Sequence, residues 1–237
     1  MAGAGDLPAI RQAIESCDRC RRLRLYCARI ARDKKAAHRH EPYWGRPVAG
    51  FGDPHARVLV LGLAPAAHGG NRTGRPFTGD GSSDFLMHAM HATGFANIPT
   101  SQHRDDGLRL RDAYIAAAAR CAPPANKPTA DELANCFPHL RREFDALRRV
   151  RVVVALGRVA SDSYWKLLAD LGHPLPKPRP AFGHARIFEP GLGRDGARAP
   201  TLVESYHPSR QNTNTGRLTR AMLVTVFREA RRLAGHP

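Results

Sequence analysis

The sequence lacks any stretch of about 18 consecutive apolar residues, so we expect no membrane-spanning helix. Its first residues, MAGAGDLPAIRQAIESC, lack the basic start and apolar core of a secretory signal, which favours a cytoplasmic protein. Internal repeats and low-complexity segments are also absent. The 237 residues are enough for a sizeable core, and we expect one domain over residues 1–237.

Acidic residues are scarce: 21 Asp and Glu stand against 37 Lys and Arg, which gives a net charge of +16. This balance favours a polyanionic partner, because each phosphate that a basic side chain neutralises releases counterions and strengthens binding. The charge therefore indicates nucleic acid, and a location on the nucleoid through DNA. A basic protein without such a partner would have the same composition, so the charge alone does not decide.

Cysteine is also rare, and five thiols in such a chain argue against a disulfide framework and for a metal or catalytic site. The spacings are Cys17-x2-Cys20 and, about a hundred residues later, Cys121-x14-Cys136. Such thiolates can bind zinc or an iron–sulfur cluster. Zinc ribbons repeat the tight spacing in both halves, whereas only the first half is tight here, which favours a structural cluster. Cys27 is then left over, and we interpret it as a core thiol. The alternative to a metal site is five unrelated buried cysteines.

Apolar runs alternate with helical patterns along the chain. The expected strands cover residues 57–61, 112–119, 151–157, 185–188 and 201–205. The expected helices cover residues 7–30, interrupted by the cysteine pair, a segment starting at Ser82 or Ser83, a segment from the Thr129 capping box to 149, a segment ending at 171, and residues 216–233. This alternation implies a parallel sheet covered by helices on both faces.

Ligands of such folds bind beyond the carboxyl ends of the strands, so segments 62–80, 121–126, 157–158 and 207–214 should share one rim. The first of them, GLAPAAHGGNRTGRPFTGD, is long for a strand-to-helix connection, which is typical of a functional loop. The alternative is a surface loop that only covers the sheet. His207 ends the last strand and can donate a hydrogen bond into a pocket at this rim, although a lone histidine is more often structural.

Taken together, GLAPA…GRPFTGD, the four spaced cysteines and SYHPSRQNTNTGRLT resemble the uracil-DNA glycosylases of family 5, the type B enzymes with an iron–sulfur cluster. The resemblance extends from Cys17 to Leu218. Family 4 is less similar, because its members carry Glu at the position of Leu63 and Asn at the position aligned with Ala117. Better-known relatives carry Asp at the position of Ala64. This sequence has none of these residues, which is the pattern of family 5.

The resemblance implies a three-layer α/β/α sandwich with a central four-stranded parallel sheet. It also implies a 4Fe–4S cluster on Cys17, Cys20, Cys121 and Cys136. The implied activity is DNA repair: hydrolysis of the bond between deoxyribose and uracil, or another damaged base such as hypoxanthine, in double-stranded DNA. The motifs contain no lysine that could attack the sugar, so we expect a monofunctional enzyme that does not cleave the strand. We also expect it to act as a monomer.

The reaction that the resemblance implies assigns roles to particular residues. The target atom is inaccessible in a duplex, so the nucleotide must flip into a pocket, where Phe77 offers a ring for stacking. His207 would donate to the departing base as it gains negative charge. Leu63 and Ala64 cannot activate water, so we assign that step to Asp80, at the far end of the loop, or to Asn212.

The remaining candidates would shape the pocket and hold the duplex. Gly62 and Ala64 are expected to line the pocket, together with Ala117, which replaces an amide that reads the base in relatives. Without that amide the pocket should accept several lesions; the alternative is that Ala117 packs under the sheet and Asn126 reads the base. From the last loop, Arg210 or Gln211 is expected to fill the gap in the duplex.

Two other functions remain open. The first is a nucleic-acid-binding or redox protein that contains a metal cluster and has no catalytic activity. The second is a metal-dependent nuclease or deaminase, although the deaminase signature of His-x-Glu with Pro-Cys-x-x-Cys is absent.

Overall fold

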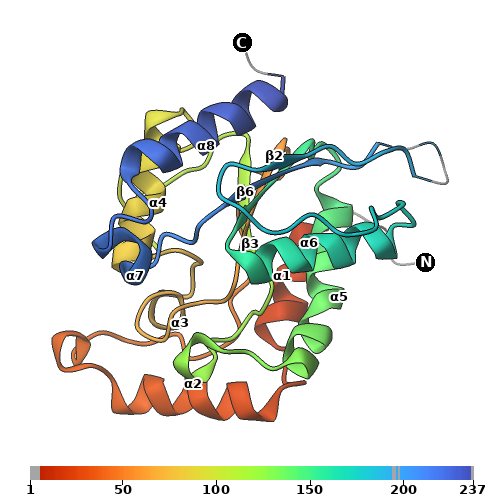
Figure 1. Cartoon of the computed structure of the whole chain (residues 1–237). Coiled ribbons are helices and arrows are strands. Elements are labelled where there is room, and N and C mark those ends of the chain that lie inside the picture. The colour runs from red at the N-terminus through yellow and green to blue at the C-terminus, as the bar shows by residue number, and fades with distance from the viewer. Residues whose placement is uncertain (1–5, 194–195, 197, 236–237) are drawn as a thin grey trace.

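A central mixed sheet with helices on both faces organises the protein (Figure 1). The computed structural model describes residues 6–193, 196 and 198–235. Within them the sheet has the order β1-β3-β2-β4-β6-β5. Its strands are β1 (Phe51–Gly52), β2 (Val58–Gly62), β3 (Ala113–Ala117), β4 (Val152–Leu156), β5 (Ile187–Phe188) and β6 (Thr201–Ser205).

The four central strands β3, β2, β4 and β6 are parallel, as the sequence predicts. The four strands that the resemblance implies are too few, because β1 and β5 add antiparallel edges to the sheet. Strand β5 confirms the strand expected over residues 185–188, although it covers only Ile187–Phe188. Strand β1 was not predicted, because its two residues are too few for an alternating apolar pattern to appear in the sequence.

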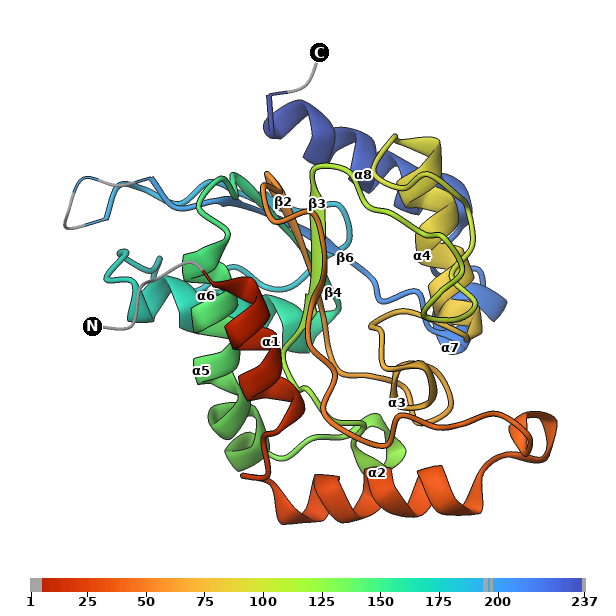
Figure 2. The ribbon, with the colours of Figure 1, turned by 180° about the vertical axis from the view of Figure 1, so that it is seen from behind.

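The helices form two layers (Figures 1 and 2). One face of the sheet is covered by α4 (Gly81–Ala92) and α8 (Arg220–Leu233), and the other by α1 (Leu7–Glu15), α5 (Ala130–Ala146) and α6 (Arg158–Asp170). The remaining helical segments are α2 (Arg21–Asp33), η1 (Ala36–His38), α3 (Gly70–Thr73), η2 (Pro124–Asn126) and α7 (Arg210–Asn214). None of the described helices is long and apolar enough to cross a membrane.

Strand β2 shows why the sheet lies at the centre. Val58 and Val60 pack in the cluster that includes α4 and α8, while Leu59 and Leu61 pack in the cluster that includes α5 and α6. All four are at most 1% exposed. A strand covered on both faces gains stability from every side chain, which explains its uninterrupted apolar run.

The helix boundaries confirm some predictions and correct others. Thr129 and Glu132 form the predicted capping box at the start of α5. The first residue of α4, in contrast, is Gly81, and its cap is Asp80 rather than Ser82 or Ser83. The Asp80 Oδ1 atom accepts hydrogen bonds from the Ser83 backbone N–H at 2.9 Å and its hydroxyl at 3.0 Å. A carboxylate also interacts favourably with the positive end of the helix, which favours Asp80 as the cap.

The end of the chain contains two helices where the sequence predicts one from residue 216. Residues 210–214 form α7, and α8 begins only after its cap, Thr219. Gly216 lies between them with φ of +70°, a left-handed conformation that interrupts a helix.

Candidate active site

The carboxyl ends of the parallel strands meet at one edge of the sheet. In the strand register Gly62 at the end of β2 lies beside Ala117 at the end of β3, and Leu156 of β4 lies beside Ser205 of β6. The loops that follow these strands carry α3 and α7, which lie at this end of the sheet (Figure 2). The predicted rim is therefore present.

Phe77 lies directly over the end of β2. A Cβ atom added to Gly62 would come within 2.7 Å of the Phe77 ring, so only glycine leaves room for the ring there. The ring stacks with that of His207, with centroids 5.8 Å apart and planes inclined by 30°. Phe77 has φ of +46°, an unfavourable conformation for a bulky residue that the surrounding contacts must hold. Two residues far apart in the sequence thus form one aromatic surface at the rim.

His207 occupies a position that favours its neutral form. Burial lowers the pKa of His207 to about 4, so the imidazole is uncharged at neutral pH and has one N–H to donate. A Cβ on Gly157 would contact the His207 Cβ at 3.4 Å, so the ends of β4 and β6 approach closely. The Asn212 Nδ2 atom donates to the His207 backbone carbonyl at 2.8 Å and fixes the turn.

Asp80 combines a structural contact with a potential chemical one. Its Oδ1 atom caps α4, whereas Oδ2 is the atom not engaged in the cap. The Oδ2 atom packs against the Gly69 backbone, where any Cβ would collide with it. The turn at residues 69–80 thus brings one carboxylate oxygen back onto the start of the same loop.

The predicted pocket residues Ala64 and Ala117 lie on the segments that follow β2 and end β3, at the same rim as Phe77 and His207. Ala117 is 5% exposed, and the next backbone N–H, that of Ala118, donates to the Gly62 carbonyl at 2.9 Å. Ala64 is partly buried on the loop beyond β2. The methyl groups of Ala64 and Ala117 provide neither a donor nor an acceptor to a ligand.

The predicted DNA contacts are at the surface. Asn126 is exposed, with φ of +55°, in the loop after β3. Arg210 and Gln211 are exposed in the first turn of α7. The Arg210 Nε atom lies 3.5 Å from where a Cβ on Gly81 would be, which places α7 beside the start of α4.

The four predicted ligand cysteines come together from distant segments. The loop after β3 passes directly over α2, as Figure 1 shows. The Cys20 thiol interacts electrostatically with those of Cys17 and Cys121, and the Cys136 thiol with those of Cys20 and Cys121. Burial raises the pKa of Cys136 to about 11, and it also raises the pKa of Cys20. Cys27 is buried and donates to the Ala122 carbonyl at 3.6 Å, as expected of a core thiol.

The spacing of these thiols distinguishes between two kinds of metal centre. Among the described residues, no three His, Cys, Asp or Glu side chains converge closely enough to hold a metal ion. A single zinc ion requires such convergence, because its bonds to sulfur are about 2.3 Å long. The ligands of an iron–sulfur cluster stand further apart, because iron and sulfide lie between them. The arrangement of the four thiols therefore fits an iron–sulfur cluster better than it fits a single zinc ion.

Comparison with known proteins agrees with this arrangement. A family model described as the uracil DNA glycosylase superfamily matches residues 49–231. The chain belongs to this superfamily.

Several curated relatives match over almost their whole length. A type-5 uracil-DNA glycosylase of Thermus thermophilus is 49% identical over 230 residues, which cover 97% of this chain and 99% of that protein. Proteins of the same name from Mycobacterium bovis and Pyrobaculum aerophilum are 45% and 46% identical over 234 and 222 residues. These matches cover 98% and 93% of this chain, and 84% and 90% of the relatives. The predicted family, fold class and enzyme class are confirmed.

The superfamily member contains a support for Phe77 that the sequence did not predict. Arg75 is 3% exposed and donates to Thr78 at 2.9 Å, to Ser101 at 2.9 Å and to Asp106 at 2.7 Å. Burial opposes the ionisation of Asp106, but the Arg75 hydrogen bond and two backbone N–H groups outweigh it and lower the pKa of Asp106 to about 2. Ser101 and Asp106 are 26 and 31 positions from Arg75, so no local pattern reveals these two partners.

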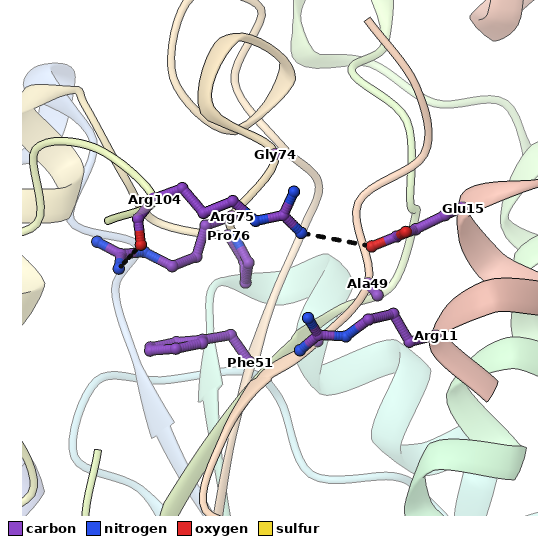
Figure 3. A pocket seen from close by; sticks show the side chains of 9 residues that line it. Arg11, Glu15, Ala49, Phe51, Gly74, Arg75, Pro76 and Arg104 are labelled. Carbon is purple, nitrogen blue, oxygen red and sulfur yellow. Dashed lines mark hydrogen bonds and ion pairs between the residues drawn. The ribbon is translucent and has the colours of Figure 1, made fainter. Parts of the chain in front are cut away.

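A separate cavity of about 200 Å³ lies on the other side of this loop, between α1 and residues 74–76 (Figure 3). Its lining includes Arg11, Phe51 and Arg104, and Arg104 pairs with Glu15 at 3.5 Å. Its lining contains none of the predicted site residues. The cavity adds positive charge next to the loop that carries Phe77.

Proposed function

We propose that this superfamily member is a monofunctional DNA glycosylase that removes uracil and other deaminated or damaged bases, such as hypoxanthine, from double-stranded DNA. The stacked Phe77–His207 pair over Gly62 is the observation that supports this proposal most directly. Its position at the carboxyl ends of the strands is where ligands of such folds bind. The names of the relatives, type-5 uracil-DNA glycosylases, support uracil as one substrate.

In the proposed reaction the damaged nucleotide flips out of the duplex and its base stacks on Phe77. The neutral His207 then donates its N–H to the base carbonyl as the base leaves with negative charge. A preorganised donor of this kind stabilises the developing charge without a reorganisation cost. The geometry supports this role because His207 is already oriented by Asn212 and by its stack with Phe77.

We propose that Asp80 positions and activates the water molecule that attacks the sugar. Its Oδ2 atom is free of the helix cap and lies on the inner side of the loop. Asn212, the alternative, uses its amide nitrogen to hold the His207 carbonyl and has only its side-chain oxygen to offer. The rim segments 62–80, 117–126 and 205–217 contain no lysine, so the proposal includes no attack on the sugar by an amine and no strand cleavage.

The proposed enzyme holds the duplex mainly through positive charge, and acts as a monomer. The net charge of +16 favours contacts with phosphates. Arg210 or Gln211, exposed in the first turn of α7, would fill the space that the flipped nucleotide leaves.

We further propose that a 4Fe–4S cluster binds to Cys17, Cys20, Cys121 and Cys136. The grouping of the thiols supports this, since each lies near at least one other of the four, but no three converge closely enough for a single ion. The bound cluster would supply covalent cross-links between the amino-terminal segment and the 121–136 region, not the chemistry of base release. Purified protein should then contain iron and acid-labile sulfide at about four each per chain.

One assay tests the activity. A duplex with a single uracil is incubated with the protein and then either heated in alkali or left untreated. We expect strand breaks only after alkali, because base release leaves an abasic site that alkali cleaves. Binding without any break would favour a non-catalytic DNA-binding protein, and breaks without alkali would show that strand cleavage occurs.

His207→Ala should lower the single-turnover rate of base release by about 100-fold or more, the usual loss for an oxyanion donor. Duplex affinity should change little, since the histidine donates to the base and not to the phosphates. His55→Ala, at an exposed position away from the rim, is the matched control. Equal losses of rate and affinity in His207→Ala would mean that His207 only holds DNA.

A further inference from the structure

A buried polar group lies between β3 and α5, next to the cysteines. Arg120, His139 and Glu143 are 1%, 3% and 1% exposed. The Arg120 Nη2 and Glu143 Oε2 atoms are 2.6 Å apart, but they lack the alignment of a hydrogen bond. Glu143 uses its other oxygen, Oε1, to accept from the Gly50 N–H at 2.9 Å and the Tyr114 hydroxyl at 3.2 Å.

This group contains most of the buried side-chain polar atoms that have no hydrogen-bond partner among the described residues. They are Nε, Nη1 and Nη2 of Arg120, both ring nitrogens of His139, and Oε2 of Glu143. Buried donors and acceptors that lack a hydrogen-bond partner are costly, and folded proteins normally satisfy them. Their concentration at one place indicates that this region interacts with something besides the surrounding side chains.

The cysteines are the nearest candidates for that interaction. Arg120 immediately precedes Cys121, and its backbone N–H donates to the Cys136 thiol. On α5, Cys136, His139 and Glu143 are spaced by three and four residues, which places them along one face of the helix. Arg120 therefore lies against the face of α5 that also carries a cluster ligand.

We propose that Arg120 is a positioning residue for the iron–sulfur cluster, to which it supplies positive charge and N–H donors. The inference rests on the cluster proposed above. Four thiolates and their cluster bring net negative charge into a buried region, and such charge is stable only when it is paired and hydrogen-bonded. Glu143 orients the guanidinium and is itself tied to Gly50 and Tyr114.

The competing explanation is that Arg120 only neutralises Glu143. Arg120→Met cannot separate the two, because it leaves Glu143 buried without its cation. The double variant Arg120→Met/Glu143→Gln can, since it removes both charges and keeps an acceptor for Gly50 and Tyr114. Arg120→Lys retains the charge but loses the planar array of donors. Arg32→Gln, which breaks an exposed ion pair with Asp33 at the end of α2, is the matched control.

The readouts are iron and sulfide per chain, the rate of iron release to a chelator, the reduction potential and the thermal unfolding temperature. We expect the double variant to fold but to release iron about tenfold faster than wild type, as for other residues that support metal ligands. Its potential should shift to more negative values, because the lost cation is adjacent to the ligand Cys121 and stabilises the reduced form, whereas the lost carboxylate is two helical turns from Cys136. Arg120→Lys should release iron at an intermediate rate, and Arg32→Gln at the wild-type rate.

A wild-type protein that contains iron, with a folded double variant that retains it equally well at an unchanged potential, would overturn this inference alone. A wild type that holds no iron or sulfide even when purified without oxygen would overturn the cluster proposal and this inference with it. If the double variant does not fold, Arg120→Lys decides: release of iron at the wild-type rate would overturn the donor role.

Discussion

At the scale of single residues, the site depends on contacts that only certain side chains permit. Phe77 and His207 form one surface because Gly62 leaves space for the ring and burial keeps the imidazole neutral. Asp80 is the residue in which structure and proposed chemistry overlap most closely. Its two carboxylate oxygens face different partners, so the two roles can be tested separately.

Asp80→Asn should slow base release by about 100-fold or more, as expected when a general base is lost, while the thermal stability hardly changes. Asparagine caps helices as well as aspartate does, so α4 keeps its cap. Single-turnover rates and thermal unfolding check both parts. Thr219→Ala, which removes the cap of α8, should lower stability by about 1 kcal/mol and leave the rate unchanged. Normal turnover in Asp80→Asn would show that Asp80 does not activate the water and would assign that role to Asn212.

Ala117 carries a prediction about the range of substrates. With only a methyl group beside Gly62, the pocket contains no amide at this position to match the edge of uracil. Wild type should therefore release hypoxanthine as well as uracil, and Ala117→Asn should lose hypoxanthine while keeping uracil, because unmatched polar groups reject the wrong base. Release from duplexes with either base is the measurement. Strict uracil specificity of the wild type would refute the open-pocket interpretation.

At the scale of helices and strands, the features that depend on local sequence could be predicted, and those that depend on distant contacts could not. The run Val58–Leu61 and the Thr129 capping box each contain their own signal. The edge strand β1, which the sequence did not predict, has two residues and exists only because β3 pairs with it. Likewise the rim could be predicted from strand order, but the partners of Arg75 and Arg120 lie too far along the chain for any pattern to indicate them.

The junction between the end of β2 and the long loop is the element on which the stacked pair depends. Gly62→Ala should push the Phe77 ring away from His207, because the new Cβ would lie 2.7 Å from the ring. We expect base release to fall by on the order of tenfold to 100-fold, as for small misplacements of reacting groups, with the overall fold kept. Gly191→Ala, where a Cβ meets nothing within 4 Å, is the matched control. Equal rates in both variants would show that the close packing is not needed.

At the scale of the whole molecule, the net charge of +16 and the small reading surface at the rim predict how DNA is recognised. Phosphate contacts should provide most of the affinity, and only the flipped base should be read, so flanking sequence should matter little. The logarithm of the binding constant should fall linearly with the logarithm of salt concentration. Arg217→Gln, at an exposed position between α7 and α8, should reduce that slope by about one, the contribution of a single phosphate contact. Arg22→Gln, whose guanidinium is already paired with Glu132, should leave the slope unchanged. A binding constant that does not respond to salt would contradict the charge argument and require base or shape contacts in its place.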